Sequence, residues 1–256
     1  MNNIHNFVIK RSEGKAVLTK YIGKKYDAYI PDEITHIGIG AFEENKVITN
    51  VFMPDGLIDI GAYAFSKCRY LATIEVPNSV THIGNNAFAL NSCLNHLILP
   101  DNITSIESHL FFGATGLKEI ILTNKITSIG YLSFSGCSSL ESIKVPHSVE
   151  FIDKYAFSDC INLRSIELPN GIKAIKMYTF AGCESLEKIT IGEGVSEIEE
   201  SAFSGCSCLT EVVLPSSLKT ISKNAFKNCK KLKNIDFCNN DIDIHKTSFK
   251  GSQVKL

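Results

Sequence analysis

The chain has 256 residues and a formal net charge of −1, with 44% hydrophobic and 21% charged residues. This composition excludes an intrinsically disordered chain. No apolar run approaches the roughly 18 residues that would span a bilayer, and the amino terminus lacks an apolar stretch of signal-peptide length. As it stands, the sequence predicts a cytoplasmic protein without membrane insertion. An export segment ahead of Met1 would instead place it on the cell surface or outside the cell.

Residues 1–30 are expected to form an amino-terminal cap. Apolar and polar residues alternate between positions 8 and 30 around Gly14 and Gly23, a pattern typical of a hairpin. A hairpin here would cover the first unit of the array that follows. Such a cover is needed because an open array exposes the edges of its strands.

From residue 31 onward the sequence repeats every 23 residues. Thr123 and Gly192 fill two positions of a proline column, whose prolines are Pro31, Pro54, Pro77, Pro100, Pro146, Pro169 and Pro215. Eleven residues later stand Phe42, Phe65, Phe88, Phe111, Phe134, Phe157, Phe180, Phe203, Phe226 and Phe249, the tenth following Cys238 in the proline position. Six residues after the proline position stand Ile37, Ile60, Ile83, Ile106, Ile129, Ile152, Ile175, Ile198, Ile221 and Ile244. Six residues before it stand Leu71, Leu94, Leu117, Leu140, Leu163, Leu186, Leu209 and Leu232.

Each unit contains one short strand and one turn that we expect to be helical. The alternating I-x-V-P step predicts a strand with one buried face, which the proline ends because it cannot donate to a ladder. The three-residue apolar spacing of A-F-x-x-C-x-x-L suits a single helical turn. One unit cannot bury its apolar side alone, so stacked units must share a core. We therefore expect an α/β repeat protein with parallel strands.

The predicted boundaries follow the repeat. A nine-repeat solenoid spans residues 31–237, and at one strand spacing per unit it is roughly 45 Å long. A truncated repeat and carboxyl-terminal cap follow at residues 238–256, where Asp241 replaces the usual Val, Ile or Leu. No linker interrupts the register, so the whole chain is expected to be one domain.

The signature V-P-x-x-V-x-x-I-x-x-x-A-F-x-x-C-x-x-L-x-x-I resembles the BspA-like leucine-rich repeat family (leucine-rich repeat type 5). The signature is clearest at residues 145–166 and 168–189. Together with its other repetitions it covers about 85% of the chain. The resemblance implies a right-handed leucine-rich-repeat solenoid. Several family members are surface proteins that bind host matrix, other cells or other proteins. The family has no shared catalytic residues, so none can be carried over to this chain. The sequence also has no phosphate-binding glycine loop, nucleophile elbow or H-E-x-x-H helix, so we expect a non-enzymatic protein.

Six of the nine cysteines share one column, three residues after the phenylalanine. They are Cys68, Cys137, Cys160, Cys183, Cys206 and Cys229. Spacing alone permits disulfides, but side chains in a ladder point the same way, and zinc needs ligands that converge. A buried ladder of unpaired thiols, suited to a reducing compartment, is the favoured interpretation. Disulfides and a metal site stay open as alternatives.

His36, Asp59 and His82 share another column on three successive units. Two imidazoles flanking a carboxylate have the donor types that hold a divalent cation. A hydrogen-bonded polar ladder is the favoured interpretation, and the metal site is the weaker candidate. We expect no cofactor.

The outward strand position carries the strongest functional signal. In the amino-terminal half it holds Tyr29, Phe52, Ile98 and Ile121, whereas in the carboxyl-terminal half it is mostly polar. Contiguous large apolar residues on an exposed sheet indicate a contact surface, for which His96 and Glu119 would provide polar groups at the rim. Self-association, a covering loop and simple β-propensity are alternative explanations.

Charge is distributed unevenly along the chain. Residues 215–256 hold nine basic and three acidic residues, among them Lys219, Lys223, Lys227, Lys230, Lys231 and Lys233. No aromatic stacking platform accompanies these lysines, so we do not expect nucleic-acid binding. The sequence therefore predicts a non-enzymatic scaffold for protein–protein interaction, with a protein partner or a second copy on its strand face. The alternative is a secreted or cell-surface adhesin that binds host matrix or other cells.

Overall fold

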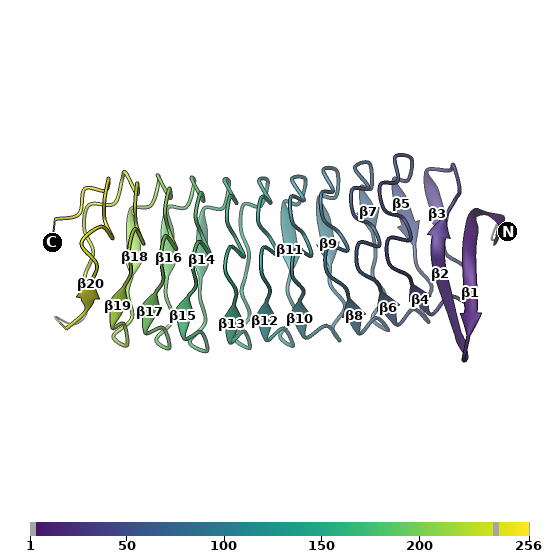
Figure 1. Cartoon of the computed structure of the whole chain (residues 1–256), viewed down its shortest axis with the longest axis horizontal. Helices are drawn as coiled ribbons and strands as arrows, with labels where there is room; N and C mark the ends of the chain where they lie inside the picture. Colours follow the sequence, from purple (N-terminus) through teal and green to yellow (C-terminus); the bar gives the residue numbers. More distant parts are fainter. Residues whose placement is uncertain (1–3, 238–240, 256) are drawn as a thin grey trace.

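The 23-residue period places equivalent residues of successive units side by side. In the computed structural model, which describes residues 4–237 and 241–255, the units form a single row of about ten coils (Figure 1). The chain begins at one end of the row and finishes at the other. Cys238, and with it the predicted start of the truncated repeat, lies outside the described residues.

Two ladders of short parallel strands run along the row. The strand ahead of each proline position forms the first ladder: β3 (Asp27–Tyr29), β5 (Asn50–Phe52), β7 (Thr73–Ile74), β9 (His96–Ile98), β11 (Glu119–Ile121), β14 (Ser165–Glu167), β16 (Lys188–Thr190) and β18 (Glu211–Val213). The strand that carries the isoleucine column forms the second: β4 (His36–Ile37), β6 (Asp59–Ile60), β8 (His82–Ile83), β10 (Ser105–Ile106), β12 (Ser128–Ile129), β13 (Phe151–Ile152), β15 (Ala174–Ile175), β17 (Glu197–Ile198), β19 (Thr220–Ile221) and β20 (Asp243–Ile244).

An antiparallel hairpin covers the amino-terminal end. It follows a 3₁₀ turn, η1 (Ile4–Asn6), and consists of β1 (Phe7–Ser12) and β2 (Lys15–Tyr21). Glu13 and Gly14 both have positive φ, 52° and 77°, as a two-residue hairpin turn requires. Strand β2 pairs in parallel with β4, so the hairpin continues the second ladder beyond the first coil.

The phenylalanine column forms the centre of the core. From Phe42 to Phe249 each ring stacks on the next with ring centroids 4.8–5.9 Å apart. Tyr21 of the hairpin extends this stack at 5.0 Å from Phe42. The isoleucine and leucine columns are buried around the rings, except that Ile244 in the last coil is only partly buried. This continuous core explains why no single unit is expected to be stable alone.

The expected helical turns are absent, and this part of the α/β prediction was wrong. Within the described residues the only helix is η1, and the A-F-x-x-C segments are successive tight turns. Their amides alternate between two partners: Phe65 N–H donates to Ala87 O of the next coil (2.8 Å), whereas Ser66 N–H donates to Tyr63 O within its own turn (3.0 Å). An α-helix would need every amide for its own i−4 carbonyl. Left-handed residues such as Tyr63 (φ 57°) and Lys67 (φ 59°) also interrupt any helix.

Candidate interaction surface

In the three-residue strands of the first ladder the second residue is buried, and the third residue points outward. Ala28, Val51 and Leu97 are buried, while the residues that follow them point to solvent. The four large apolar members of the outward column are each about half exposed: Tyr29 54%, Phe52 47%, Ile98 55% and Ile121 48%. We call these four side chains the apolar strip.

The strip consists of two pairs of side chains, and the two members of each pair lie on adjacent coils. The rings of Tyr29 and Phe52 stack at 4.5 Å with an interplanar angle of 7°. Ile98 and Ile121 are directly paired in the register of β9 and β11. Glu75, which is exposed, occupies the coil between the two pairs. One carboxylate therefore separates the two apolar pairs of the strip.

The predicted rim residues lie beside the strip. His96 and Glu119 are both exposed and are register partners in β9 and β11. They share the outward face with Ile98 and Ile121, two residues further along each strand. The structure therefore brings together the six residues proposed from the sequence. Their role in binding a partner stays a prediction.

Several carboxylates that were not predicted from the sequence lie around the strip. Asp27 precedes Tyr29 by two residues on the same face, and Asp32, Asp55 and Asp101 follow the proline position at the other side. We define the acidic rim as the six exposed residues Asp27, Asp32, Asp55, Glu75, Asp101 and Glu119. The signal that could have revealed it is the column after the proline position, which holds Asp32, Asp55, Asn78 and Asp101 in the amino-terminal coils.

The His36–Asp59–His82 row is assembled, but its side chains do not converge on one point. The three residues are successive register partners in β4, β6 and β8. His82 Nδ1 lies 2.7 Å from Asp59 Oδ1, whereas His36 Nδ1 lies 2.8 Å from its neighbour Thr35 Oγ1. Across the described parts of the chain, no group of three or more His, Cys, Asp or Glu side chains is placed to hold a metal ion.

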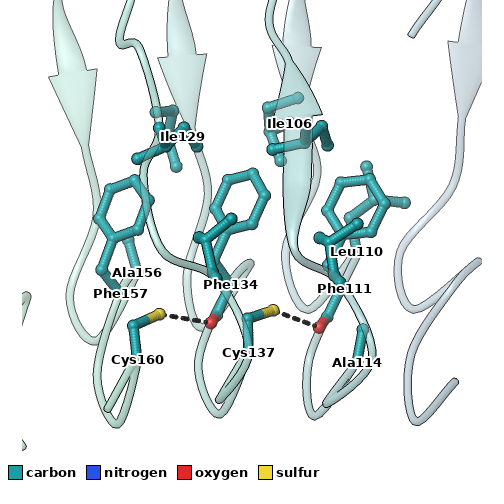
Figure 2. Close-up of a cluster of buried hydrophobic side chains, with 14 of the residues drawn as sticks. Ile106, Leu110, Phe111, Ala114, Ile129, Phe134, Cys137, Ala156, Phe157 and Cys160 are labelled. Atoms are coloured by element: carbon teal, nitrogen blue, oxygen red, sulfur yellow. Dashed lines mark hydrogen bonds between the residues drawn. The ribbon is translucent and has the colours of Figure 1, made fainter. Parts of the chain in front are cut away.

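The cysteine column has a structural role that the sequence did not reveal. Each of its six buried thiols donates to a phenylalanine carbonyl of the preceding coil at 3.0–3.2 Å. Figure 2 shows Cys137 with Phe111 and Cys160 with Phe134. Asn91 stands at the equivalent position and donates from its amide to Phe65 O at 3.0 Å. The column therefore supplies a second donor to carbonyls that are buried inside the turns.

These thiols are poor nucleophiles. Burial raises the pKa of Cys68 to about 12, and it also raises the pKa of the deeper thiols such as Cys160. All cysteines in the described ranges are free, and Cys93 is the one with an exposed side chain. Because a thiolate is the reactive species, this column packs the core and is not suited to catalysis.

A row of aromatic residues borders the turns of the middle coils. His109 contacts Tyr131 edge-on at 5.2 Å between ring centroids, and Tyr155 stacks on Tyr178 at 4.7 Å. Desolvation lowers the pKa of His109 and raises that of Tyr155. Tyr131 meets Tyr155 edge-on at 5.9 Å, so within the row only Tyr155 and Tyr178 are stacked.

The lysine-rich end lies away from the apolar strip. Lys219, Lys223, Lys230, Lys231 and Lys233 are exposed, and Lys227 is half-buried. Lys223 Nζ lies 3.4 Å from Glu200 Oε1. An open depression of about 350 Å³ at this end is lined by residues that include Glu200, Lys223, Asp243 and His245.

No described helix is long or apolar enough to cross a membrane. A second depression, of about 460 Å³, lies beside the hairpin tip and is lined by Arg11, Glu13, Lys15 and Glu33 among others. Neither of these two depressions is lined by a residue of the apolar strip.

Known proteins share this architecture. A leucine-rich-repeat protein of T. pallidum shares 26% sequence identity and a TM-score of 0.56, with 80% of this chain and 88% of that chain covered. One from Bacteroides ovatus shares 23% identity and a TM-score of 0.58, with 97% and 89% covered. The pneumococcal vaccine antigen PcpA shares 20% identity and a TM-score of 0.50, with 88% and 69% covered. The last two similarities show the fold alone.

Curated proteins gave no significant match. The family described as "BspA type Leucine rich repeat region" matches residues 24–141 and 127–255, in six copies. These two ranges overlap and together reach from the first ladder strand to the last described residue. The chain belongs to the BspA-type leucine-rich-repeat family.

Proposed function

We propose that the protein is a non-enzymatic interaction scaffold that binds a protein partner through the apolar strip. The observation that carries this proposal is the contrast within one column. Tyr29, Phe52, Ile98 and Ile121 are half-exposed in the amino-terminal coils, whereas Lys144 and Glu167 hold the same position further along. Large exposed apolar side chains gathered on one face are typical of a protein contact site.

The rigidity of the ladder supports this proposal. Strands β3, β5 and β7 hydrogen-bond to one another, and so do β9 and β11, which fixes the spacing of the outward side chains. The stacked rings of Tyr29 and Phe52 restrict each other further. A surface that is ordered before it binds loses little conformational entropy on binding, so more of the contact energy contributes to affinity.

A comparison of two double variants tests the proposal. Phe52→Asp/Ile121→Asp places two charges on the strip, and Thr190→Asp/Val213→Asp places two charges in the same outward column of the carboxyl-terminal coils. Partners captured by the wild-type protein are quantified after pull-down with each variant, once circular dichroism shows that both are folded. We expect the strip variant to capture at least about ten-fold less partner than the wild-type protein. Two desolvated apolar contacts contribute more than about 1.4 kcal/mol to the binding free energy, which corresponds to this factor. The control variant is expected to retain capture.

Equal capture by the wild-type protein and the folded strip variant would show that the strip is not the contact site. Loss of capture by the control variant alone would place the site on the carboxyl-terminal coils instead.

The second candidate function is a cell-surface adhesin. The similarity of fold to a pneumococcal vaccine antigen favours this candidate. The free thiol column favours the scaffold in a reducing compartment. Immunolocalisation of the tagged native gene product separates the two: surface labelling of intact cells supports the adhesin, and labelling only after permeabilisation supports the scaffold.

A further inference from the structure

The acidic rim carries charge that no ion pair within the described residues neutralises. Among the described residues none of its six carboxylates takes part in an ion pair. Asp27 accepts a hydrogen bond from Asn50 Nδ2 at 2.6 Å, so its oxygen is held in place by a neutral partner. The three outward columns that contain the strip and the rim hold six carboxylates and no Lys or Arg between β3 and β11.

The rim lies close enough to the strip to act on anything that covers it. Asp27 is two extended residues before Tyr29, and Asp32 is three residues after it, so the Cα atoms of both aspartates lie within roughly 10 Å of the Cα atom of Tyr29. This distance is about one Debye length at 0.1 M salt. A partner that buries the strip therefore brings its own flanking groups into the field of the rim.

The carboxyl-terminal coils show that this charge is not a general property of the strand face. On β16 and β18, Lys188 Nζ and Glu211 Oε1 form an ion pair at 2.6 Å in the equivalent outward column. The Asp27 column has no such cation in the amino-terminal coils, where His96 stands beside Glu119. The unbalanced carboxylates thus coincide with the apolar strip.

We infer that the strip binds a cationic amphipathic helix, with apolar side chains over the two apolar pairs and a lysine or arginine over Glu75. This inference rests on the proposed function. The strip runs over four strand spacings, about 19 Å, which a helix covers with about 13 residues. One helical turn, about 5.4 Å, nearly equals the spacing of successive coils, so successive turns meet successive coils.

Two labelled model peptides of 18 residues provide the probes. Both carry leucines at helical spacing on one face, and one has lysines in the centre and along the flanks of that face where the other has glutamates. Binding to the intact protein is measured by fluorescence anisotropy at 50 and 300 mM NaCl. We expect the lysine peptide to bind at least about ten-fold more tightly than the glutamate peptide at 50 mM NaCl, because several favourable charge contacts replace repulsive ones. The difference should shrink at 300 mM.

A matched pair of charge variants locates the effect. Glu75→Gln/Glu119→Gln should weaken binding of the lysine peptide by about three- to ten-fold at 50 mM NaCl, since each exposed pair contributes modestly. Glu167→Gln/Asp236→Asn changes the net charge equally in the carboxyl-terminal coils and should leave binding within about two-fold. Equal weakening by both variants would mean that net charge alone attracts the peptide, and would overturn the inference.

Phe52→Ser/Ile121→Ser separates this inference from the proposed function. If both peptides bind equally and both lose affinity in this variant, the strip is a contact site without charge preference, and only the inference fails. If neither peptide loses affinity, the strip is not a docking surface, and both fail. If sedimentation equilibrium shows a wild-type dimer that this variant abolishes, the occupant is a second copy of the chain, which also overturns the inference.

Discussion

The amino-terminal and carboxyl-terminal coils are nearly identical inside and different outside. Phe65 and Phe203 are both fully buried between stacked neighbours, although six coils separate them. The outward column, by contrast, has Phe52 in one half and Glu167 in the other. The interior is constrained because every coil must fit the next, whereas the outer columns have no such partner. The outer columns are therefore where the two halves of the molecule differ in the surface that they expose.

The largest expected effect on stability comes from removing a core phenylalanine ring, and it tests whether the interior is equally packed in both halves. Phe65→Ala and Phe203→Ala should each lower the free energy of unfolding by about 3–5 kcal/mol, because each leaves a cavity within the ring stack. Chemical denaturation followed by circular dichroism measures both values. A difference of more than about 2 kcal/mol between the two would contradict equal packing, and would show that one half is able to unfold before the other.

The cysteine column gives a smaller effect that depends on pH. Cys68→Ala should cost about 1–2 kcal/mol at pH 7, since it removes a buried sulfur and the donor to Phe42 O. The pKa of the Cys68 thiol is raised from an ordinary value of 9.0 to about 12 in the folded protein. Above pH 9 the unfolded chain therefore loses this proton while the folded chain keeps it, which lowers the stability of the wild-type protein but not of the variant.

The free energies of unfolding of the wild-type protein and of Cys68→Ala should accordingly converge by about 1.4 kcal/mol per pH unit above pH 9. Urea denaturation at pH 7, 9 and 10 measures them, and lysines and tyrosines cancel because both proteins contain them. Cys183→Ala in the carboxyl-terminal half should behave alike, since burial raises the pKa of that thiol as well. A difference that stays constant from pH 7 to pH 10 would mean that the thiol titrates equally in both states.

The sequence predicted the coil, the first of the two parallel ladders and the outward column because each depends on position within a fixed period. It did not predict the second ladder, because its strands are only two residues long and show no alternation. It failed for the turns, since a three-residue spacing of apolar side chains is common to a helical turn and to linked tight turns. Positive φ at Tyr63 and Lys67 has no compositional signal, because glycine usually marks such positions. The hydrogen bonds of the cysteine column were also missed. Each joins a thiol to the backbone carbonyl of a phenylalanine 26 residues earlier, on the preceding coil, and a backbone acceptor leaves no signal in the sequence. The acidic rim could have been found, as its columns are visible in the repeat.

The smallest effect concerns the His36–Asp59–His82 row, which occurs only in the amino-terminal coils. The side chains of His82 and Asp59 are 55% and 30% exposed, so their contact is screened by solvent. In a double-mutant cycle with His82→Ala and Asp59→Asn, the coupling should be about 0.5 kcal/mol or less. Titration calorimetry with Zn²⁺ should show no saturable heat, because His36 Nδ1 is engaged by Thr35 and a zinc site needs converging ligands. Micromolar binding that is lost in both single variants would instead make this row a metal site, and would add a second functional difference between the two halves of the molecule.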